Sequence, residues 1–187
     1  YDEAMISYAL KRELNRGGQV FFVHNRTYDI DEVCQKMRSL ANSGSRVAYA
    51  HGQMPEKELE EVMVGFLEKE IDCLVSTAII ESGIDVPWAN TIIVNNAHTF
   101  GLSDLHQLRG RVGRFERKAY SYFLIPKNEP LNPEARKRLE AVKEYSQLGA
   151  GFRIAMEDLE IRGAGNLLGT QQHGHIQAVG FDLYCRL

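Results

Sequence analysis

The chain has 187 residues, of which 44% are hydrophobic and 25% are charged, enough apolar material for one α/β domain with an appendage. Its net charge of −3 excludes a wholly basic nucleic-acid binder, so any nucleic-acid surface has to be a local patch. No stretch approaches the roughly 20 apolar residues of a membrane helix, and the start of the chain is too acidic for a signal peptide. We therefore expect a soluble, cytoplasmic protein with no membrane partner.

The first two thirds of the chain alternate short apolar runs with segments of helical spacing. A helix is predicted over residues 2–16 and a strand buried on both faces over residues 19–23. Further helices are predicted over 27–42, 56–67 and 102–113, and further strands over 46–50, 72–76, 91–94 and 119–125. This alternation predicts a mostly parallel sheet flanked by helices, with ligands at the carboxyl ends of the strands.

The character of the chain changes after residue 126. Asn132 and Pro133 predict the start of another helix, with Asn132 as its cap, that runs to Gly149. Residues 151–187 are rich in glycine yet too apolar for a disordered linker, which predicts an ordered appendage of loops and short helix. We expect two domains, residues 1–128 and 129–187.

The three cysteines lie far apart in the sequence, and none has a C-x-x-C spacing. This favours reduced thiols over disulfides or a zinc site. His173 and His175 lie close together, but two further ligands at suitable spacing are missing. The sequence therefore predicts no metal site.

The most specific motif is the octet Gln107-Leu-Arg-Gly-Arg-Val-Gly-Arg114. On a helix, Gln107, Arg111 and Arg114 would share one face. Glycines at positions 110 and 113 would cost that helix roughly 1 kcal/mol each relative to alanine, which favours a bulky ligand such as a triphosphate against this face. Two guanidinium groups there could hold a transferring phosphoryl group, as an arginine finger does. The alternative is a solvated basic helix.

This octet resembles motif VI of the superfamily 2 helicases, and the rest of the chain carries further motifs of that family in order. Residues 76–87 follow a predicted strand and resemble motif V. The resemblance implies that Thr77 contacts the DNA backbone and that Gly83 and Asp85 couple this contact to the bound nucleotide. Without the family, Thr77 could be a helix cap and Asp85 part of a turn.

Two other strand ends carry the remaining candidates for DNA contact. Phe22-Val-His-Asn-Arg26 resembles motif IV, which implies that Asn25 and Arg26 grip DNA phosphates. His51 and Gly52 lie in a segment that resembles a strand-end turn offering backbone amides to a phosphate. A single histidine in such a place is more often a hydrogen-bonded structural residue than a ligand.

The last part of the chain, after residue 150, indicates which of these helicases the chain resembles most. Residues 151–169 resemble the translocation motif shared by RecG and the transcription-repair coupling factors, and residues 172–184 look like the coupling factors rather than RecG. The resemblance implies that Arg162 and Gln172 link the appendage to the motor. Arg162 could instead form a plain surface ion pair with a nearby Glu157, Asp158 or Glu160.

Across its whole length the chain resembles the second RecA-like domain of these bacterial coupling factors, which implies a three-layer α/β fold. The resemblance implies an ATP-driven translocase on double-stranded DNA that displaces stalled RNA polymerase and recruits excision repair through modules outside this sequence. There is no Gly-x-x-x-x-Gly-Lys-Ser/Thr and no convincing acidic metal-binding box. We therefore expect the first RecA-like domain to hold ATP and Mg²⁺, and this chain alone to be inactive. The alternatives are a RecG-like fork-remodelling helicase and a non-catalytic DNA- or protein-binding scaffold.

Overall fold

The structure is a computed structural model that describes residues 2–77, 86, 88–113, 117–127, 130–145 and 150–162. The chain forms two compact units, one of residues 1–97 and 107–129 and one of residues 98–106 and 130–187. The second unit thus includes residues 98–106 in addition to the predicted appendage. The division predicted after residue 128 stays a prediction.

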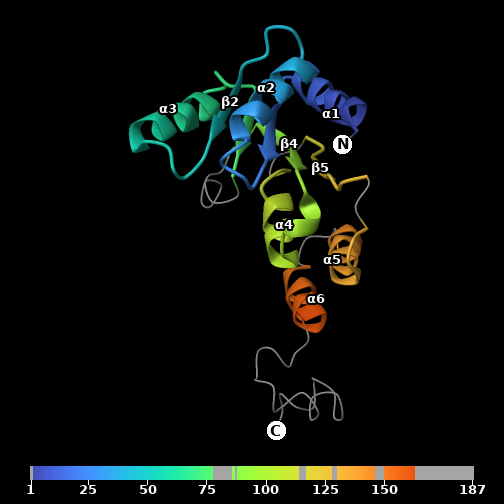
Figure 1. Cartoon of the computed structure of the whole chain (residues 1–187). Helices are drawn as coiled ribbons and strands as arrows, with labels where there is room; N and C mark the ends of the chain where they lie inside the picture. The colour runs from blue at the N-terminus through green and yellow to red at the C-terminus, as the bar shows by residue number, and fades with distance from the viewer. Residues whose placement is uncertain are drawn as a thin grey trace, which may run out of the picture. The chain divides into compact units, whose positions relative to one another are not determined.

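The first unit is built on a five-stranded parallel sheet (Figure 1). In the spatial order β2-β3-β1-β4-β5, its strands are β2 (Val47–Ala50), β3 (Cys73–Ser76), β1 (Gln19–Val23), β4 (Ala89–Val94) and β5 (Tyr120–Phe123). Each predicted strand is confirmed. Strands β1, β3 and β4 are buried along their whole length, which explains why they read as mainly apolar runs.

Helices cover both faces of this sheet. They are α1 (Glu3–Asn15), α2 (Ile30–Leu40) and α3 (Glu56–Leu67). The core on the α1 and α2 side includes Ile6, Leu10, Val20, Phe22, Ile30, Met37 and Ile93. On the other face, Phe66 of α3 packs edge-on against Phe21, with ring centroids 4.8 Å apart. Successive strand residues point to opposite faces, so Phe21 and Phe22 anchor different helical layers, and the predicted three-layer fold is confirmed.

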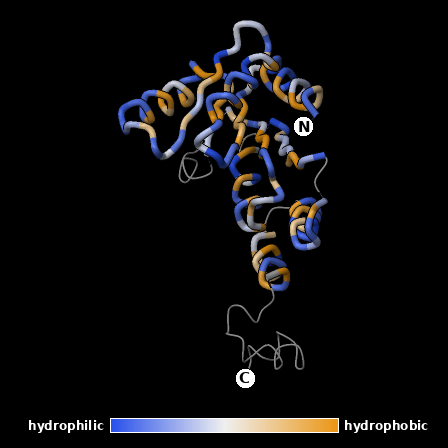
Figure 2. Tube along the Cα trace, in the orientation of Figure 1, coloured by the Kyte–Doolittle hydropathy of each residue, from blue (hydrophilic) through white to orange (hydrophobic). Residues whose placement is uncertain are grey.

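These packed side chains supply most of the stabilisation, since each fully buried Leu, Ile or Phe contributes about 1.5–3 kcal/mol. Hydrophobic and hydrophilic segments alternate along the helices (Figure 2), as expected where one side of a helix packs and the other faces solvent.

The end of α1 is tied to the sheet by a buried carboxylate. Glu13 is 1% exposed, and its Oε2 accepts hydrogen bonds from the Thr91 hydroxyl at 2.6 Å and from the Arg16 guanidinium at 2.5 Å. A Cβ added at Gly18 would lie 1.7 Å from Glu13 Oε1, so the glycine makes room for the carboxylate. This arrangement fixes α1 against the beginning of β1 and β4.

The second unit is helical in its described part. Its elements are the first turn of α4 (Leu102–Arg109), α5 (Pro133–Glu144) and α6 (Gly151–Arg162), and the short 3₁₀ helix η1 (Ala97–Thr99) precedes α4. The Asn132 side chain accepts a hydrogen bond from the Ala135 N–H at 2.6 Å, which confirms the predicted cap of α5. Within this unit the Ser103 hydroxyl donates to Asp158 at 3.3 Å, and the Arg138 guanidinium donates to the His98 carbonyl at 3.2 Å.

Candidate functional site

The carboxyl ends of the central strands align at one edge of the sheet. Val23 at the end of β1 pairs with Ser76 of β3 and Val94 of β4, and Ser76 also pairs with Ala50 of β2. The backbone N–H of His24 donates to the Ser76 carbonyl at 2.8 Å, so the ladder continues one residue past the strands. Residues that follow separate strands in the sequence therefore lie side by side, as the parallel-sheet rule predicts.

His24 is a structural residue at the centre of this edge. It is 3% exposed, its Nδ1 accepts a hydrogen bond from the Asn95 side-chain amide at 2.8 Å, and its Nε2 donates to Asp29 at 2.7 Å. Both ring nitrogens are thus engaged within the chain. The histidine holds the end of β1 and presents the next two residues, Asn25 and Arg26, which are both exposed.

The exposed pair has an aromatic neighbour. The Arg26 guanidinium donates to the Tyr28 hydroxyl at 3.1 Å, and Tyr28 is 80% exposed. An exposed guanidinium beside an exposed phenol offers hydrogen-bond donors to a phosphate, and neither group has to leave a packed core to reach it.

The turn after β2 supplies the second group. His51 is half-buried, its ring stacks on Tyr49 with the planes 10° apart, and its Nδ1 accepts a hydrogen bond from the Gln53 N–H at 3.3 Å. Gly52 is exposed, and a Cβ added to it would meet no atom within 4 Å. Packing within the chain therefore does not require glycine at position 52, and the absence of a side chain leaves room for close approach of a ligand.

Thr77 follows β3 at the same edge. Its backbone N–H donates to the Ala50 carbonyl at 3.4 Å, and the residue is only 4% exposed. Among the five residues predicted to contact DNA, Thr77 is therefore the least accessible. The remaining motif V candidates, Gly83 and Asp85, lie outside the described residues.

The octet does not form one continuous helix, and the prediction that Gln107, Arg111 and Arg114 share a helical face is wrong. Helix α4 ends at Arg109. The N–H of Arg111 then bonds to the Leu108 carbonyl at 3.1 Å in a turn, and Gly113 has a φ of +86°. A Cβ at Gly113 would lie 2.9 Å from the Ala119 Cβ, so this glycine serves the backbone and not the space for a ligand.

The predicted phosphate-binding roles do not depend on a shared helical face. Gln107 is exposed and Arg111 half-exposed, so both side chains reach the surface at the end of α4. Their amide and guanidinium donors suit phosphate oxygens. Arg114 and Gln172 lie outside the described residues, and Arg162 is the last residue of α6.

Asn95 is the residue at this edge that the sequence analysis missed. It is 2% exposed, and its backbone N–H donates to the Val23 carbonyl at 2.8 Å while its side chain holds His24. The signal was present, because two asparagines directly follow a buried strand. Polar residues at such a position are candidates for the functional edge.

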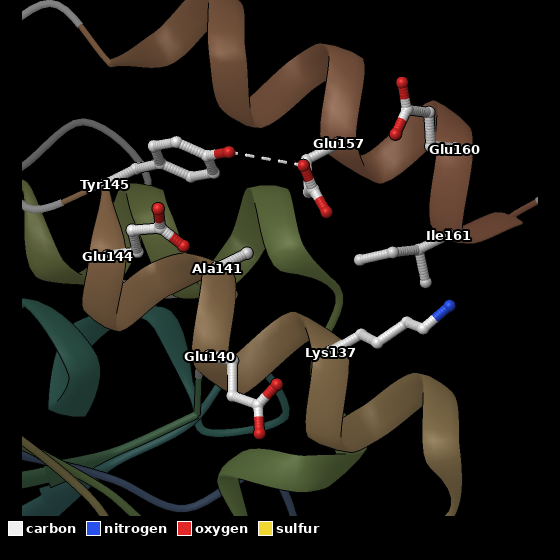
Figure 3. Close-up of a pocket in the computed structure, with 8 residues that line it drawn as sticks. All are labelled: Lys137, Glu140, Ala141, Glu144, Tyr145, Glu157, Glu160 and Ile161. Carbon is white, nitrogen blue, oxygen red and sulfur yellow. Dashed lines mark hydrogen bonds between the residues drawn. The ribbon is translucent and has the colours of Figure 1, made fainter.

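The second unit has a groove of about 360 Å³ between α5 and α6 (Figure 3). Four glutamates line it together with Lys137, namely Glu140, Glu144, Glu157 and Glu160. The Tyr145 hydroxyl donates to Glu157 at 3.4 Å, and the negative charge of Glu157 raises the pKa of that phenol. Such an acidic lining repels phosphate, so the groove is not the nucleotide or DNA site.

Two absences concern only the described part of the chain. No cluster of three or more His, Cys, Asp or Glu side chains is placed to hold a metal ion there. His173 and His175 lie outside it. Within the same residues, no helix is both long enough and apolar enough to cross a bilayer.

Residues 3–116 match the family model of the helicase conserved C-terminal domain, and the chain belongs to this family. It is 56% identical over all 187 residues to the transcription-repair-coupling factor of Bacillus subtilis, and 56% identical over 182 residues to that of Staphylococcus epidermidis. The chain spans 16% of the length of each of these relatives.

Solved structures agree with this assignment. A structure of RecG bound to a three-way DNA junction matches 91% of the chain and 22% of the RecG chain, with a TM-score of 0.70 and 35% identity. The C-terminal domain of the DEAD-box protein Dbp5 matches 76% of this chain and 79% of its own with a TM-score of 0.54 and 22% identity, which shows the shared fold alone.

Proposed function

We propose that this chain is the second RecA-like motor domain of a bacterial, ATP-dependent translocase on double-stranded DNA. The complete protein would displace stalled RNA polymerase and promote transcription-coupled excision repair. The observation that carries this proposal is the 56% identity to a coupling factor over the entire chain, including the tail beyond the helicase family match. A RecG-type fork-remodelling helicase is less well supported, since the RecG identity is 35%.

The DNA grip is assigned to the carboxyl edge of the sheet. Asn25, Arg26, His51 and Gly52 offer exposed or half-exposed donors and open space at adjacent strand ends, and Thr77 lies between them in the sheet. Contacts to phosphate fix the position of a duplex and carry no sequence information, which suits a motor that moves along any DNA.

The nucleotide side is assigned to Gln107, Arg111 and Arg114, with Gly83 and Asp85 as the link to the DNA grip. ATP with Mg²⁺ would be bound mainly by a first RecA-like domain, and hydrolysis would release the phosphate that holds the two domains closed. The residues of this chain contribute positive charge and orientation at the transferring phosphate. RNA polymerase and an excision-repair protein would bind through other parts of the complete protein.

The test replaces Arg114 in the full-length protein. We expect Arg114→Ala to retain ATP binding while slowing DNA-stimulated hydrolysis by on the order of 10³–10⁵, as for other arginine fingers. Arg114→Lys should rescue poorly, because an ammonium group cannot form the planar two-pronged contact. Arg136→Ala, at an exposed site on α5, is the matched control and should hydrolyse ATP normally.

Two results would contradict the proposal. One is hydrolysis by Arg114→Ala at the unmodified rate with DNA present. The other is robust ATP turnover by this chain alone, because the chain supplies only the arginine side of the site.

A further inference from the structure

A stripe of exposed and half-buried side chains runs along one side of α1 and its C-cap. Met5, Tyr8, Arg12 and Arg16 recur at helical spacing, so they share one side of the helix. Met5 is 49% exposed and Tyr8 is 60% exposed. Neighbouring large apolar side chains on one exposed helix side differ from the scattered single residues that every surface shows.

Strand β5, at the edge of the sheet, completes this surface. The Tyr120 ring lies under three cations: the Arg12 guanidinium is 3.8 Å from the ring centroid, the Arg16 guanidinium 5.3 Å and the Lys118 ammonium 5.7 Å. Arg12 also donates a hydrogen bond to the Tyr120 hydroxyl. The ring attracts these cations, which favours their gathering around it.

Positive charge on this surface exceeds the negative charge found beside it. Arg117 joins the three cations, since its guanidinium donates to the Arg16 carbonyl at 2.9 Å. Among the described residues, the ion pair that these four cations form is between Arg16 and the buried Glu13. The whole chain has a net charge of −3, so this concentration is local. Like charges held together favour a partner of opposite charge.

We propose that this surface, the α1–β5 patch of Met5, Tyr8, Arg12, Arg16, Arg117, Lys118 and Tyr120, docks an acidic segment of a partner protein. Its composition favours protein over nucleic acid. Tyrosine, methionine and arginine are enriched in protein interfaces, whereas a phosphate backbone gains nothing from an exposed methionine.

The position of the cations in the sheet also favours a protein partner over DNA. Arg16 is the C-cap of α1, three residues before β1 begins, and Lys118 lies two residues before β5 begins, so these cations lie at the amino edge of the parallel sheet. The DNA grip of the proposed function lies at the carboxyl edge, about 15 Å away along strands that rise about 3.3 Å per residue. A duplex held at that edge faces away from this patch. The separation of the patch from the DNA grip rests on the proposed function, while the charge and composition of the patch do not.

The test uses the whole chain with three fluorescent probes: a short peptide of glutamates, a matched peptide of glutamates with interspersed phenylalanines, and a DNA duplex. We expect both peptides to bind with an affinity that falls as salt rises, and the phenylalanine peptide to bind more tightly because Met5 and Tyr8 offer apolar contact. Tyr8→Ala should weaken the binding of the phenylalanine peptide more than that of the glutamate peptide, so that the difference between the two affinities becomes smaller.

Charge-reversal variants distinguish an acidic protein partner from DNA. Arg117→Glu with Lys118→Glu should weaken the binding of both peptides about fivefold or more and leave duplex binding within about twofold. Lys57→Glu at an exposed site on α3 is the control and should change neither peptide affinity. Circular dichroism checks folding, and Lys118→Ala replaces the double variant if that variant does not fold.

Absence of peptide binding, equal loss with Lys57→Glu, or loss of duplex binding in place of peptide binding would each overturn the proposal. None of these outcomes bears on the ATPase test of Arg114, so the two proposals fail separately.

Discussion

His24 is buried between two polar partners, and its environment explains how the strand end keeps its shape. Asn95 donates to one ring nitrogen and Asp29 accepts from the other. A buried polar atom that loses its partner costs about 1–3 kcal/mol. The position of the exposed Asn25 and Arg26 therefore depends on a network that contacts no ligand itself.

Asn95→Leu should remove the donor to His24 and destabilise the chain by about 1–3 kcal/mol. Asn25→Ala, at the exposed neighbour, should change the free energy of unfolding by no more than about 0.5 kcal/mol. Urea unfolding of both variants measures the difference. Equal unfolding midpoints would show that the network is not needed for the stability of this edge.

The two cysteines within the described residues are buried thiols. Burial raises the pKa of both Cys34 and Cys73 above the ordinary thiol value. Above pH about 8.5 the unfolded chain loses thiol protons that the folded chain keeps, so the stabilising contribution is complete below that pH and is lost as pH rises.

Stability should therefore fall by up to about 1.4 kcal/mol per pH unit for each buried thiol above pH about 8.5. Cys73→Ala should unfold at lower urea yet lose less stability between pH about 8.5 and 10 than the unmodified chain. Both proteins carry Cys185→Ser, so that the measurement reports the described thiols. Equal pH slopes would contradict the prediction.

At the scale of elements, two turn glycines have opposite roles. Gly113 has a positive φ and a neighbour at 2.9 Å from an added Cβ, whereas Gly52 has open space around it. Gly113→Ala should destabilise by about 1–3 kcal/mol through backbone strain and the clash with Ala119. Gly52→Ala should leave stability within about 0.5 kcal/mol and weaken duplex binding instead.

Thermal unfolding and a duplex-binding titration on the same samples separate the two effects. Undiminished DNA affinity in Gly52→Ala would remove that glycine from the DNA grip. Undiminished stability in Gly113→Ala would mean that the turn relaxes around a side chain.

Elements with one dominant signal were predictable from sequence. Strand β1 was predicted with its observed bounds because it is buried on both faces, and α5 begins where Asn132 caps it. Helix α2 was predicted to begin at residue 27 but begins at Ile30, after the N-cap residue Asp29, whose side chain bonds to His24 and not to a helix N–H. Helix α4 was predicted too long because the octet has helical spacing, although Gly113 requires a left-handed backbone.

Buried polar contacts were not predictable in the same way. Glu13 lies among charged residues in the sequence, yet it bonds to Thr91, 78 positions away. Its partner depends on how β4 pairs with β1, and local spacing does not contain that information. The rule that ligands of a parallel sheet bind at the carboxyl ends of its strands nevertheless predicted where the candidate site lies.

At the scale of the whole molecule, the proposed function requires a link between the motor domain and the helical segment that carries Arg162. Arg162 is the last residue of α6, and we propose that it links this helical segment to the motor. The alternative is a plain surface ion pair, which would contribute only about 0–1 kcal/mol to stability.

In the full-length protein, Arg162→Ala should keep DNA-stimulated ATP hydrolysis and abolish displacement of a triplex strand or a stalled polymerase. The control is Arg153→Ala, which removes an exposed arginine from the same helix and should leave both activities intact. Both activities are measured on one folded preparation, because only a transmission role uncouples them. A surface ion pair would spare both, and a residue needed for folding would lose both. Normal displacement alongside normal hydrolysis in Arg162→Ala would therefore exclude this arginine from the mechanism.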